Sequence, residues 1–548
     1  MRAPSNAALL VLASLCLETC AAETQDTTKA SKASKAKYQG ACPPYEHYAR
    51  FPHRPYSKGA MELPYQRPSP PCRTFESDLV EKVIRDINAS MIDRDLARIF
   101  ENAFPNTLDT TVKWHVDGTE QPSMKPQQVM RYGAEGAWEG AQSFIVTGDI
   151  NACWLRDSTN QLAQYQRLAK RDKSIETLVL GAINTQAEYV IESPYCNAFQ
   201  PPPPSKLKPS DNGQGDSVHP AYEPGQVFEC KYELDSLAHF LSLGNQFFNH
   251  TGSTAFLTTR WYSALESLLV VLDEQARPTF NPETGSFERQ AYRFQRQTNT
   301  GTETLNLAGT GNPLADGTGL IRSAFRPSDD STILGFFIPA NAMMAVELKR
   351  TAAILEKVGK ASLAANLQAR GEVIEKGVWE YGVVKHKTYG QIFAFEVDGY
   401  GSHIMMDDAN LPSLLALPLL GFLGLEDKVY QNTRKMILSK AGNPYYLTGP
   451  AFSGIGGPHI GFSNAWPMSL LVQAMTSDDE EITALLEKVK EASPLGLIHE
   501  SVNVDRVDDY TRSWFAWANS VFAQTILDLA ERKPELLFGE GAKPYLVG

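Results

Sequence analysis

The sequence predicts an all-α protein, a barrel of six helical hairpins of the (α/α)6 type with long loops at one mouth. Three observations support this. Apolar residues make up 43% of the 548 residues, which is enough to fill a large core and argues against disorder. About a dozen helix candidates of two kinds alternate along the chain. Polar motifs stand before the candidates of one kind.

The two kinds of helix candidate differ in how their apolar residues are distributed. Some are apolar on nearly every side, which predicts helices buried all round, and each is followed by an amphipathic stretch that predicts an outer, covering helix. The apolar stretches are 333–348, 411–423 and 466–475, and their amphipathic followers are 363–378, 426–438 and 480–489. A stacked solenoid would alternate in the same way, but the chain shows no fixed repeat of about 30–45 residues.

Between the helix candidates, two stretches rich in Pro or Gly predict long loops, at 201–222 and 298–320. Loops of this length are often functional.

The first residues predict an exported protein. Residues 1–22 have a positive end, a short apolar run and small residues at a cleavage point, as a signal peptide does. An uncleaved anchor is the alternative. Residues 23–75 predict a flexible leader followed by a segment that wraps the surface, and 76–548 the helical domain. No later stretch predicts a membrane span, so we expect a secreted protein, either free outside the cell or associated with the wall.

Cysteines and sequons fit an oxidising compartment. Seven cysteines are present, and five remain once the two in the signal peptide are removed. We expect disulfides between Cys42 and Cys72, which lie beside prolines, and between Cys196 and Cys230, which bracket a Pro-rich loop. Cys153 is then a free thiol. Two triplets, Asn88-Ala-Ser90 and Asn249-His-Thr251, are glycosylation sequons.

Each polar motif mixes carboxylates with arginine, histidine or aromatic residues. The motifs are Trp154-Leu-Arg-Asp157, Tyr232-Glu-Leu-Asp235, Phe325-Arg-Pro-Ser-Asp-Asp330, His403-Ile-Met-Met-Asp-Asp408, and a loop from His499-Glu500 to a helix at Thr511. The inner helices of a hairpin barrel run parallel, so these motifs meet at one mouth. Helix capping explains the aspartates but not Trp154, Arg156, Arg326 or His403. Sugar binding and glycosidic cleavage need this mixture of groups.

Other chemistries fit the sequence less well. The net charge of −12 and the lack of a basic stripe argue against nucleic-acid binding. There is no P-loop, no nucleophile elbow, no dinucleotide fingerprint and no zinc-protease motif. The aspartates show no calcium-loop spacing, and the cysteine spacings are too wide for a zinc site. We therefore expect neither a metal nor another cofactor. The sequence carries no signal for an oligomeric state.

Four of these motifs resemble those of glycoside hydrolase family 125, whose members are exo-acting α-1,6-mannosidases. They are WLRDSTNQ (154–161), FRPSDDS (325–331), HIMMDDANLPSLLALP (403–418), and GLIHESV with YTRSWFAWANS (496–520). The resemblance runs from about residue 76 to the C-terminus. It implies an (α/α)6 barrel, inversion at the anomeric carbon, no metal, and a mannose-containing oligosaccharide or glycan as substrate.

The resemblance also implies roles for single residues. The general acid is an aspartate of the FRPSDD motif, and of the two we expect Asp329, with Asp330 capping a helix or binding sugar. The general base is Glu500. Residues expected to bind the terminal mannose are Trp154, Arg156, Asp157, Arg326, Asp330, His403, Asp407 and Asp408. Trp514 and Trp517 are further candidates, although aromatic residues of helices belong more often to the core.

Two other functions remain compatible with these residues. One is an inverting glycosidase on the same barrel that acts on α-glucosides or trehalose. The other is a non-catalytic glycan-binding protein, which would not need both Asp329 and Glu500.

Overall fold

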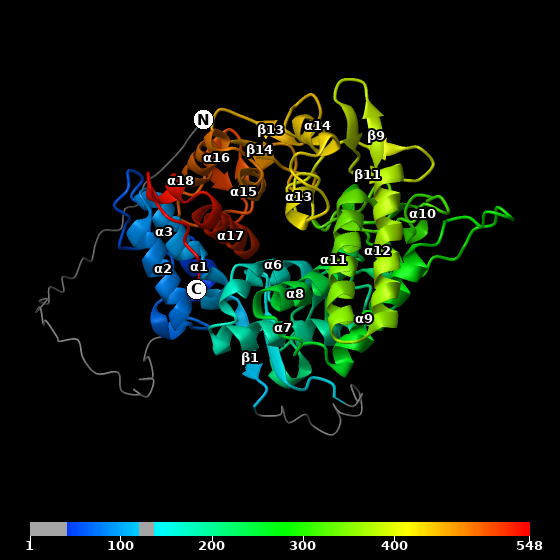
Figure 1. Ribbon diagram of the computed structural model, residues 1–548, viewed down its shortest axis with the longest axis horizontal. Helices are drawn as coiled ribbons and strands as arrows, with labels where there is room; N and C mark the ends of the chain where they lie inside the picture. The colour runs from blue at the N-terminus through cyan, green and yellow to red at the C-terminus, as the bar shows by residue number, and fades with distance from the viewer. Residues whose placement is uncertain (1–40, 120–135, 548) are drawn as a thin grey trace, which may run out of the picture. The chain divides into compact units, whose positions relative to one another are not determined.

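The computed structural model describes residues 41–119 and 136–547. The chain from Pro43 onward forms one compact unit that is rich in helices (Figure 1). The predicted signal peptide and the leader up to residue 40 lie outside the described residues. Within the described ranges, no helix is both long and apolar enough to cross a membrane.

One set of helices lies toward the centre of the view in Figure 1, and a second set lies outside it. The inner helices are α6 (Leu155–Ala163), α8 (Leu234–Thr251), α11 (Ile338–Lys357), α13 (Leu417–Leu420), α15 (Pro467–Met475) and α17 (Ala516–Arg532). The outer helices are α7 (Lys173–Glu192), α9 (Thr259–Gln275), α12 (Ala361–Tyr381), α14 (Lys428–Ile437) and α16 (Asp479–Glu491). Apart from the short α13, the inner helices bury residues on most sides, whereas α9, α12, α14 and α16 bury one side only.

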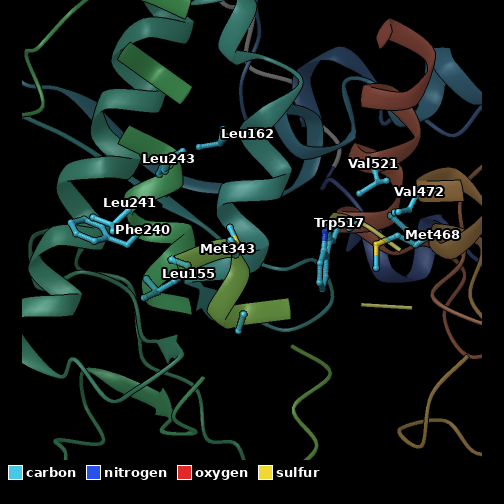
Figure 2. Close-up of a cluster of buried hydrophobic side chains, with 14 of the residues drawn as sticks. Leu155, Leu162, Phe240, Leu241, Leu243, Met343, Met468, Val472, Trp517 and Val521 are labelled. Atoms are coloured by element: carbon cyan, nitrogen blue, oxygen red, sulfur yellow. The ribbon is translucent and has the colours of Figure 1, made fainter. Parts of the chain in front are cut away.

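The core lies among the inner helices and between them and the outer helices. Figure 2 shows apolar side chains from five of them: Leu155 and Leu162 of α6, Phe240, Leu241 and Leu243 of α8, Met343 of α11, Met468 and Val472 of α15, and Trp517 and Val521 of α17. All belong to one buried cluster. Full burial of such a side chain contributes about 1.5–3 kcal/mol, so these contacts make a large contribution to stability. Pairwise packing joins α6 to α8 and α17, α8 to α11, and α15 to α17.

The helices match the expected positions with two corrections. The helix expected at 333–348 begins only at Ile338 and runs on to Lys357. The one expected at 411–423 shrinks to the four residues of α13. Pro418 at its start lacks an N–H, and Gly421 ends it in the left-handed region at φ 82°. The remaining helices are α1 (Tyr45–Tyr48), α2 (Asp78–Ser90), α3 (Arg94–Ala103), α4 (Asn106–Thr110), α10 (Asn306–Gly309) and α18 (Pro534–Phe538).

Seven small antiparallel sheets in the described ranges were not expected from the sequence. Three have three strands: β3 (Cys153–Trp154), β4 (Ala198–Phe199) and β6 (Val227–Glu229); β8 (Phe336–Phe337), β11 (Glu396–Val397) and β12 (His403–Ile404); and β15 (Asn464–Ala465), β16 (Val502–Asn503) and β17 (Arg506–Tyr510). The pairs are β1 (Val112–Asp117) with β2 (Ala141–Ile145), β5 (Ser217–His219) with β7 (Arg293–Gln295), β9 (Val383–His386) with β10 (Gly390–Phe393), and β13 (Tyr446–Thr448) with β14 (Ser453–Ile455).

The three-stranded sheets lie at the N-terminal ends of inner helices, because β3 leads directly into α6, β8 into α11, and β15 almost directly into α15. The loop expected between Glu500 and Thr511 contains the hairpin β16–β17, and α17 begins only at Ala516. Most of these strands have two or three residues, which are too few to show an alternating pattern. The long loops expected at 201–222 and 298–320 are largely irregular.

The cysteines follow the expected pattern where the structure describes a pair. Cys196 and Cys230 form a disulfide, and Cys153 is free and buried, which confirms both predictions. Cys42 and Cys72 are each disulfide-bonded, and their pairing with each other stays a prediction.

Two buried asparagines fix the loops that precede the acidic motifs. Asn341 of α11 accepts a hydrogen bond from the Ile321 amide at 2.8 Å and donates to the Ile321 carbonyl at 2.9 Å. Asn519 of α17 does the same with Ile498, at 3.1 Å in both directions. Ile321 precedes Asp329 in its loop, and Ile498 precedes Glu500. The inner helices therefore hold the two segments that carry the acidic motifs.

We expect Asn519→Leu to lower the free energy of unfolding by about 2–4 kcal/mol, because it leaves the buried amide and carbonyl of Ile498 without partners. Urea or thermal unfolding measures the effect. The matched control is Asn366→Leu on the exposed side of α12, which should change stability by less than about 0.5 kcal/mol. Equal stability of the two variants would contradict this account of the loop.

Candidate active site

A narrow pocket of about 60 Å³ opens at the N-terminal ends of the inner helices. Three acidic side chains line it, Asp157, Asp329 and Glu500. Its basic residues are Arg156, His459 and Arg512, and its aromatic residues are Trp154, Trp466, Phe515 and Trp517. Residues from α6, α15 and α17 and from the 325–331 loop therefore meet here, as the sequence predicted for a mouth where polar motifs converge.

A larger cavity of about 670 Å³ is lined by other parts of the inner helices, including Gln164, Asn249, Lys357 and Asp528. None of the site residues predicted from the sequence lines it. The chemistry of the motifs, rather than the size of the cavity, selects the small pocket as the candidate active site.

Asp329 has a strained backbone and a dense set of donors around its carboxylate. Its φ of 67° places a non-glycine residue in the left-handed region, which is uncommon and is found most often at functional sites. Its Oδ1 accepts hydrogen bonds from Asn197 Nδ2 at 3.0 Å and from Trp154 Nε1 at 3.3 Å. The side chain is 24% exposed and faces the pocket, so it can reach a bound molecule.

Arg156 is buried beneath the pocket and contacts three carboxyl groups. Its guanidinium nitrogens lie 3.4 Å from Asp157, 3.5 Å from Glu233 and 3.7 Å from Asp329. It also lies over the ring of Trp517, 5.1 Å from the centroid. Burial raises the pKa of Asp157 to about 6, although Arg156 opposes the shift. The pocket floor thus carries more carboxyl groups than cations.

The carboxyl groups of Asp329 and Glu233 accept from the same nitrogen, Asn197 Nδ2, at 3.0 Å and 3.1 Å, and have opposite pKa shifts. Burial raises the pKa of Glu233 well above its ordinary value, and the charge of Asp329 raises it further. Burial also acts to raise the pKa of Asp329, but the charges of Lys231 and Arg156 outweigh it and lower this pKa to about 2. The opposite shifts favour Glu233 over Asp329 as the site of a proton held by this pair.

Glu500 comes from the loop between α16 and β16. Its Oε2 accepts a hydrogen bond from Thr511 Oγ1 at 2.8 Å and lies 3.6 Å from Arg512 Nε. Arg512 in turn pairs with Asp149 at 3.3 Å, so its charge is shared between two carboxylates. The side chain of Glu500 is 8% exposed and borders the pocket. A carboxylate held in this way is available to accept a proton from a water molecule.

Asp330 does not line the pocket, but its carboxylate contacts His459, which does. Its Oδ2 accepts a hydrogen bond from Ser328 at 2.9 Å and lies 3.5 Å from His459 Nδ1. Although burial acts to lower the pKa of His459, Asp330 raises it to about 9, so the imidazole is charged at neutral pH. His459 lies in the loop after Gly457, where a Cβ would come within 2.6 Å of Asp408 Oδ2. The glycine at position 457 therefore allows this loop to lie close to Asp408.

Four other residues predicted to bind sugar lie outside the pocket lining. Arg326 is buried and donates to Glu396 at 2.6 Å. Asp407 accepts from the backbone amides of Leu414 and Leu415, and Asp408 accepts from Asn410. His403 is exposed on β12. The first three thus support the backbone around the site, and contact of any of the four with a sugar stays a prediction.

The prediction from sequence missed several residues of the site. Glu233 stands in a motif that was noticed, but no role was given to it. Asn197 and His459 lie in irregular segments without periodicity. Asn410 lines the pocket in place of the aspartates of its own motif. The one signal that could have found Asn197 is its position directly after Cys196, because the expected disulfide brings it beside Lys231.

Hairpins of helices with a pocket lined by carboxylates, arginines and tryptophans define a class, the helical glycoside hydrolases. Residues 93–527 match the family described as metal-independent alpha-mannosidase (GH125). The chain belongs to this family, and the protein is a glycoside hydrolase, which confirms the resemblance seen in the motifs. No group of three or more His, Cys, Asp or Glu in the described ranges is arranged to hold a metal ion.

Two relatives show how far the similarity extends. The chain is 52% identical over 499 residues to the meiotically up-regulated gene 157 protein of Schizosaccharomyces pombe, covering 91% of this chain and 94% of that protein. It is 32% identical, with a TM-score of 0.71, to a metal-independent alpha mannosidase of Streptococcus pneumoniae, solved in a non-productive complex with alpha-1,6-mannobiose. That match covers 83% of this chain and 99% of the other.

Proposed function

We propose that the protein is an exo-acting, inverting α-1,6-mannosidase that releases terminal mannose from glycans. The observation that carries this proposal is that Asp329 and Glu500, from two distant motifs, line the same pocket. Membership of an α-mannosidase family supports mannose over the α-glucoside and trehalose alternatives. The α-1,6-mannobiose bound to the pneumococcal relative supports the linkage. The presence of both carboxyl groups supports an enzyme over a glycan-binding protein.

The mechanism assigns one task to each carboxyl group. Asp329, as general acid, protonates the leaving glycosidic oxygen, and Glu500, as general base, deprotonates a water that attacks the opposite face of the sugar ring. Inversion needs room for that water, so the two carboxyl groups of such enzymes stand roughly 6.5–9.5 Å apart. Arg156 and Asp157 bind hydroxyl groups of the terminal mannose, and Trp154 contacts the apolar face of a sugar ring.

Exo action is supported by the resemblance of the four motifs to those of exo-acting α-1,6-mannosidases. Asp330 acts through His459, whose imidazolium adds a positive charge near Asp329.

The remaining proposals concern the fold and the location. We propose that the hairpins close into an (α/α)6 barrel over residues 76–548, because the packing of α17, α6, α8 and α11 already follows an arc. A crystal structure in which α13 and α15 do not close the ring would contradict this. We also propose cleavage after residue 22 and secretion, supported by the exposed sequon at Asn249. An N-terminal sequence of the exported protein that begins at Met1 would contradict it.

We expect the protein to release mannose from α-1,6-mannobiose, and β-mannose to be the first product seen by NMR, because inversion turns an α-linkage into a β-anomer. α-1,2- and α-1,3-mannobiose and an α-glucoside panel serve as controls. Release of α-mannose, or preference for an α-glucoside or for another linkage, would contradict the proposed reaction.

We expect Asp329→Asn to lower kcat on α-1,6-mannobiose by about 10²–10⁴-fold, because the variant cannot protonate the leaving oxygen. A dinitrophenyl α-mannoside needs little protonation and should be hydrolysed comparatively well. Glu500→Gln should impair both substrates alike, because water attack suffers whatever leaves. The matched control is Asp330→Asn. If that variant lost the activity on mannobiose while Asp329→Asn kept it, the acid would be Asp330.

A further inference from the structure

Glu233 lies beneath the pocket, out of reach of a bound sugar. It stands directly before α8, and its side chain is 0% exposed. Its carboxyl group lies beside that of Asp329, close enough for both to accept from the same amide nitrogen of Asn197. Two neighbouring buried carboxyl groups do not readily ionise together, which favours a proton on one of them.

Two further side chains hold the pair together. Asn197 Nδ2 donates to Glu233 Oε1 at 3.1 Å and to Asp329 Oδ1 at 3.0 Å. Arg156 contacts the second oxygen of each carboxyl group, at 3.5 Å from Glu233 and 3.7 Å from Asp329. Ser236 Oγ also donates to Glu233 Oε2 at 2.8 Å. With all these groups buried or nearly so, the two carboxyls cannot move apart without losing several charge-assisted hydrogen bonds.

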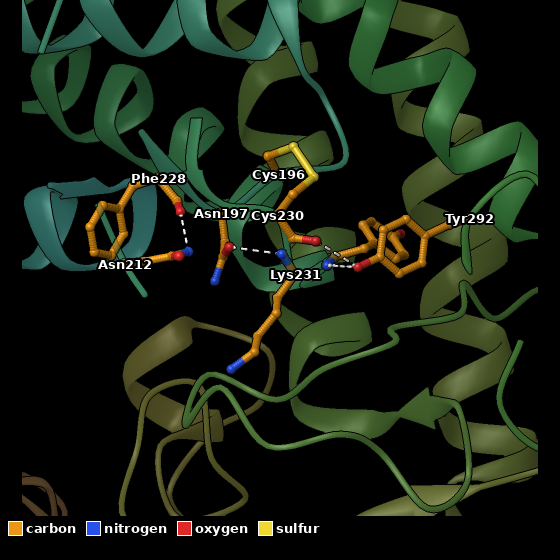
Figure 3. Close-up of a disulfide and its surroundings, with 8 residues drawn as sticks. Cys196, Asn197, Asn212, Phe228, Cys230, Lys231 and Tyr292 are labelled. Atoms are coloured by element: carbon orange, nitrogen blue, oxygen red, sulfur yellow. Dashed lines mark hydrogen bonds between the residues drawn. A yellow bond between two sulfur atoms is a disulfide. The ribbon is translucent and has the colours of Figure 1, made fainter. Parts of the chain in front are cut away.

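The Cys196–Cys230 disulfide fixes the residues around this pair. Asn197 and Lys231 directly follow the two cysteines, and Asn197 Oδ1 accepts from the Lys231 amide at 3.0 Å (Figure 3). Lys231 is 4% exposed, and its charge acts on Asp329. The disulfide thus places both the group that bridges the two carboxyls and a cation that favours ionised Asp329.

The charged groups around the pair favour the ionised form of Asp329 and the protonated form of Glu233. Lys231 from the strand before α8, Arg156 from α6 and His459 from the loop after β14 all favour the ionised form of Asp329. Asp235 from α8 disfavours the ionised form of Glu233, while Arg156 opposes this. These charges, together with burial, favour a proton on Glu233, whose pKa is raised well above the ordinary value.

A general acid must carry a proton when the glycosidic bond breaks. The charges around Asp329, however, favour its ionised form. We propose that Glu233 is the proton partner of Asp329: it positions the acid and supplies the proton that Asp329 delivers to the leaving oxygen. The inference rests on the proposed function. Glu233 is a positioning residue, because it acts through Asp329 and does not touch the sugar.

The proton transfers balance over one turnover. The O–H bond of Glu233 breaks as one forms on Asp329, and that bond breaks as one forms on the leaving oxygen. Glu500 meanwhile takes a proton from the attacking water, whose oxygen bonds to the anomeric carbon as the glycosidic bond breaks. Glu233 is left as a carboxylate and Glu500 protonated. Exchange with solvent then returns a proton to the pair and removes one from Glu500.

The test is Glu233→Gln, whose amide can still donate a hydrogen bond to Asp329 but cannot transfer a proton. We expect kcat on α-1,6-mannobiose to fall about 100-fold or more, and the dinitrophenyl α-mannoside to be hydrolysed within a few-fold of wild type. The alkaline limb of kcat/KM for mannobiose should move to lower pH by at least about one unit. In the wild type, the pair loses its proton only when the pH reaches the raised pKa of Glu233. In the variant, the proton must be held by Asp329, whose pKa is lowered to about 2, so it is lost at a lower pH.

The matched control is Glu347→Gln on α11, a buried carboxyl group whose pKa is also raised by burial but which lines the larger cavity. It should lower the unfolding temperature and leave the pH profile unchanged. If Glu233→Gln lowered the rates on both substrates equally, with an unmoved alkaline limb, Glu233 would be only structural and the inference would be wrong.

Glu233→Asp guards against a misfolded first variant. It keeps a carboxyl group but draws it away from Asp329 by one methylene, so the limb should move in the same direction by a smaller amount, and an unmoved limb would overturn the inference. Wild-type activity on α-1,6-mannobiose is measured first. Its absence would refute the proposed function, whereas normal wild-type activity with a normal Glu233→Gln profile would refute only the role of Glu233.

Discussion

Burial of several carboxyl groups around Arg156 is the constraint on which the rest of the site depends. One guanidinium contacts Asp157, Glu233 and Asp329 within 3.7 Å, and Lys231 adds a second positive charge. Buried charge is costly unless it is paired, so not all of these carboxyl groups can ionise together. The surplus favours a proton on one of them, and the opposite pKa shifts of Glu233 and Asp329 favour Glu233 as its site.

The fold keeps this unfavourable cluster in place by fixing backbone on every side of it. Asn341 and Asn519 tie the loops of Asp329 and Glu500 to inner helices, and the Cys196–Cys230 disulfide holds Asn197 and Lys231. Small sheets extend the N-terminal ends of α6, α11 and α15. These devices resist relaxation of the strained backbone at Asp329. The apolar core of the helices offsets the free-energy cost of this strain and of the buried charges.

The sequence predicted the parts of the site that belong to long, polar motifs next to apolar helices. Trp154, Arg156, Asp157, Asp329 and Glu500 do converge in one pocket. Periodicity also located α12, α14, α15 and α16 to within a few residues. The partners Glu233, Asn197 and His459 could not be predicted, because their roles come from contacts between segments far apart in the chain. A doublet of aspartates does not reveal that Asp407 accepts from the backbone amides of Leu414 and Leu415 or that Asp408 accepts from Asn410. Contact of either aspartate with a sugar stays a prediction.

The measurement that tests the central claim most directly is a crystal structure of the Glu500→Gln variant with α-1,6-mannobiose bound. The account requires the terminal mannose in the pocket, its glycosidic oxygen about 2.6–3.2 Å from a carboxyl oxygen of Asp329, and the side chain at position 500 on the opposite face of the ring. Glu233 should remain beside Asp329 beneath the sugar. A glycosidic oxygen placed against Asp330 or Asp408, or a disaccharide bound in the larger cavity instead, would contradict the account.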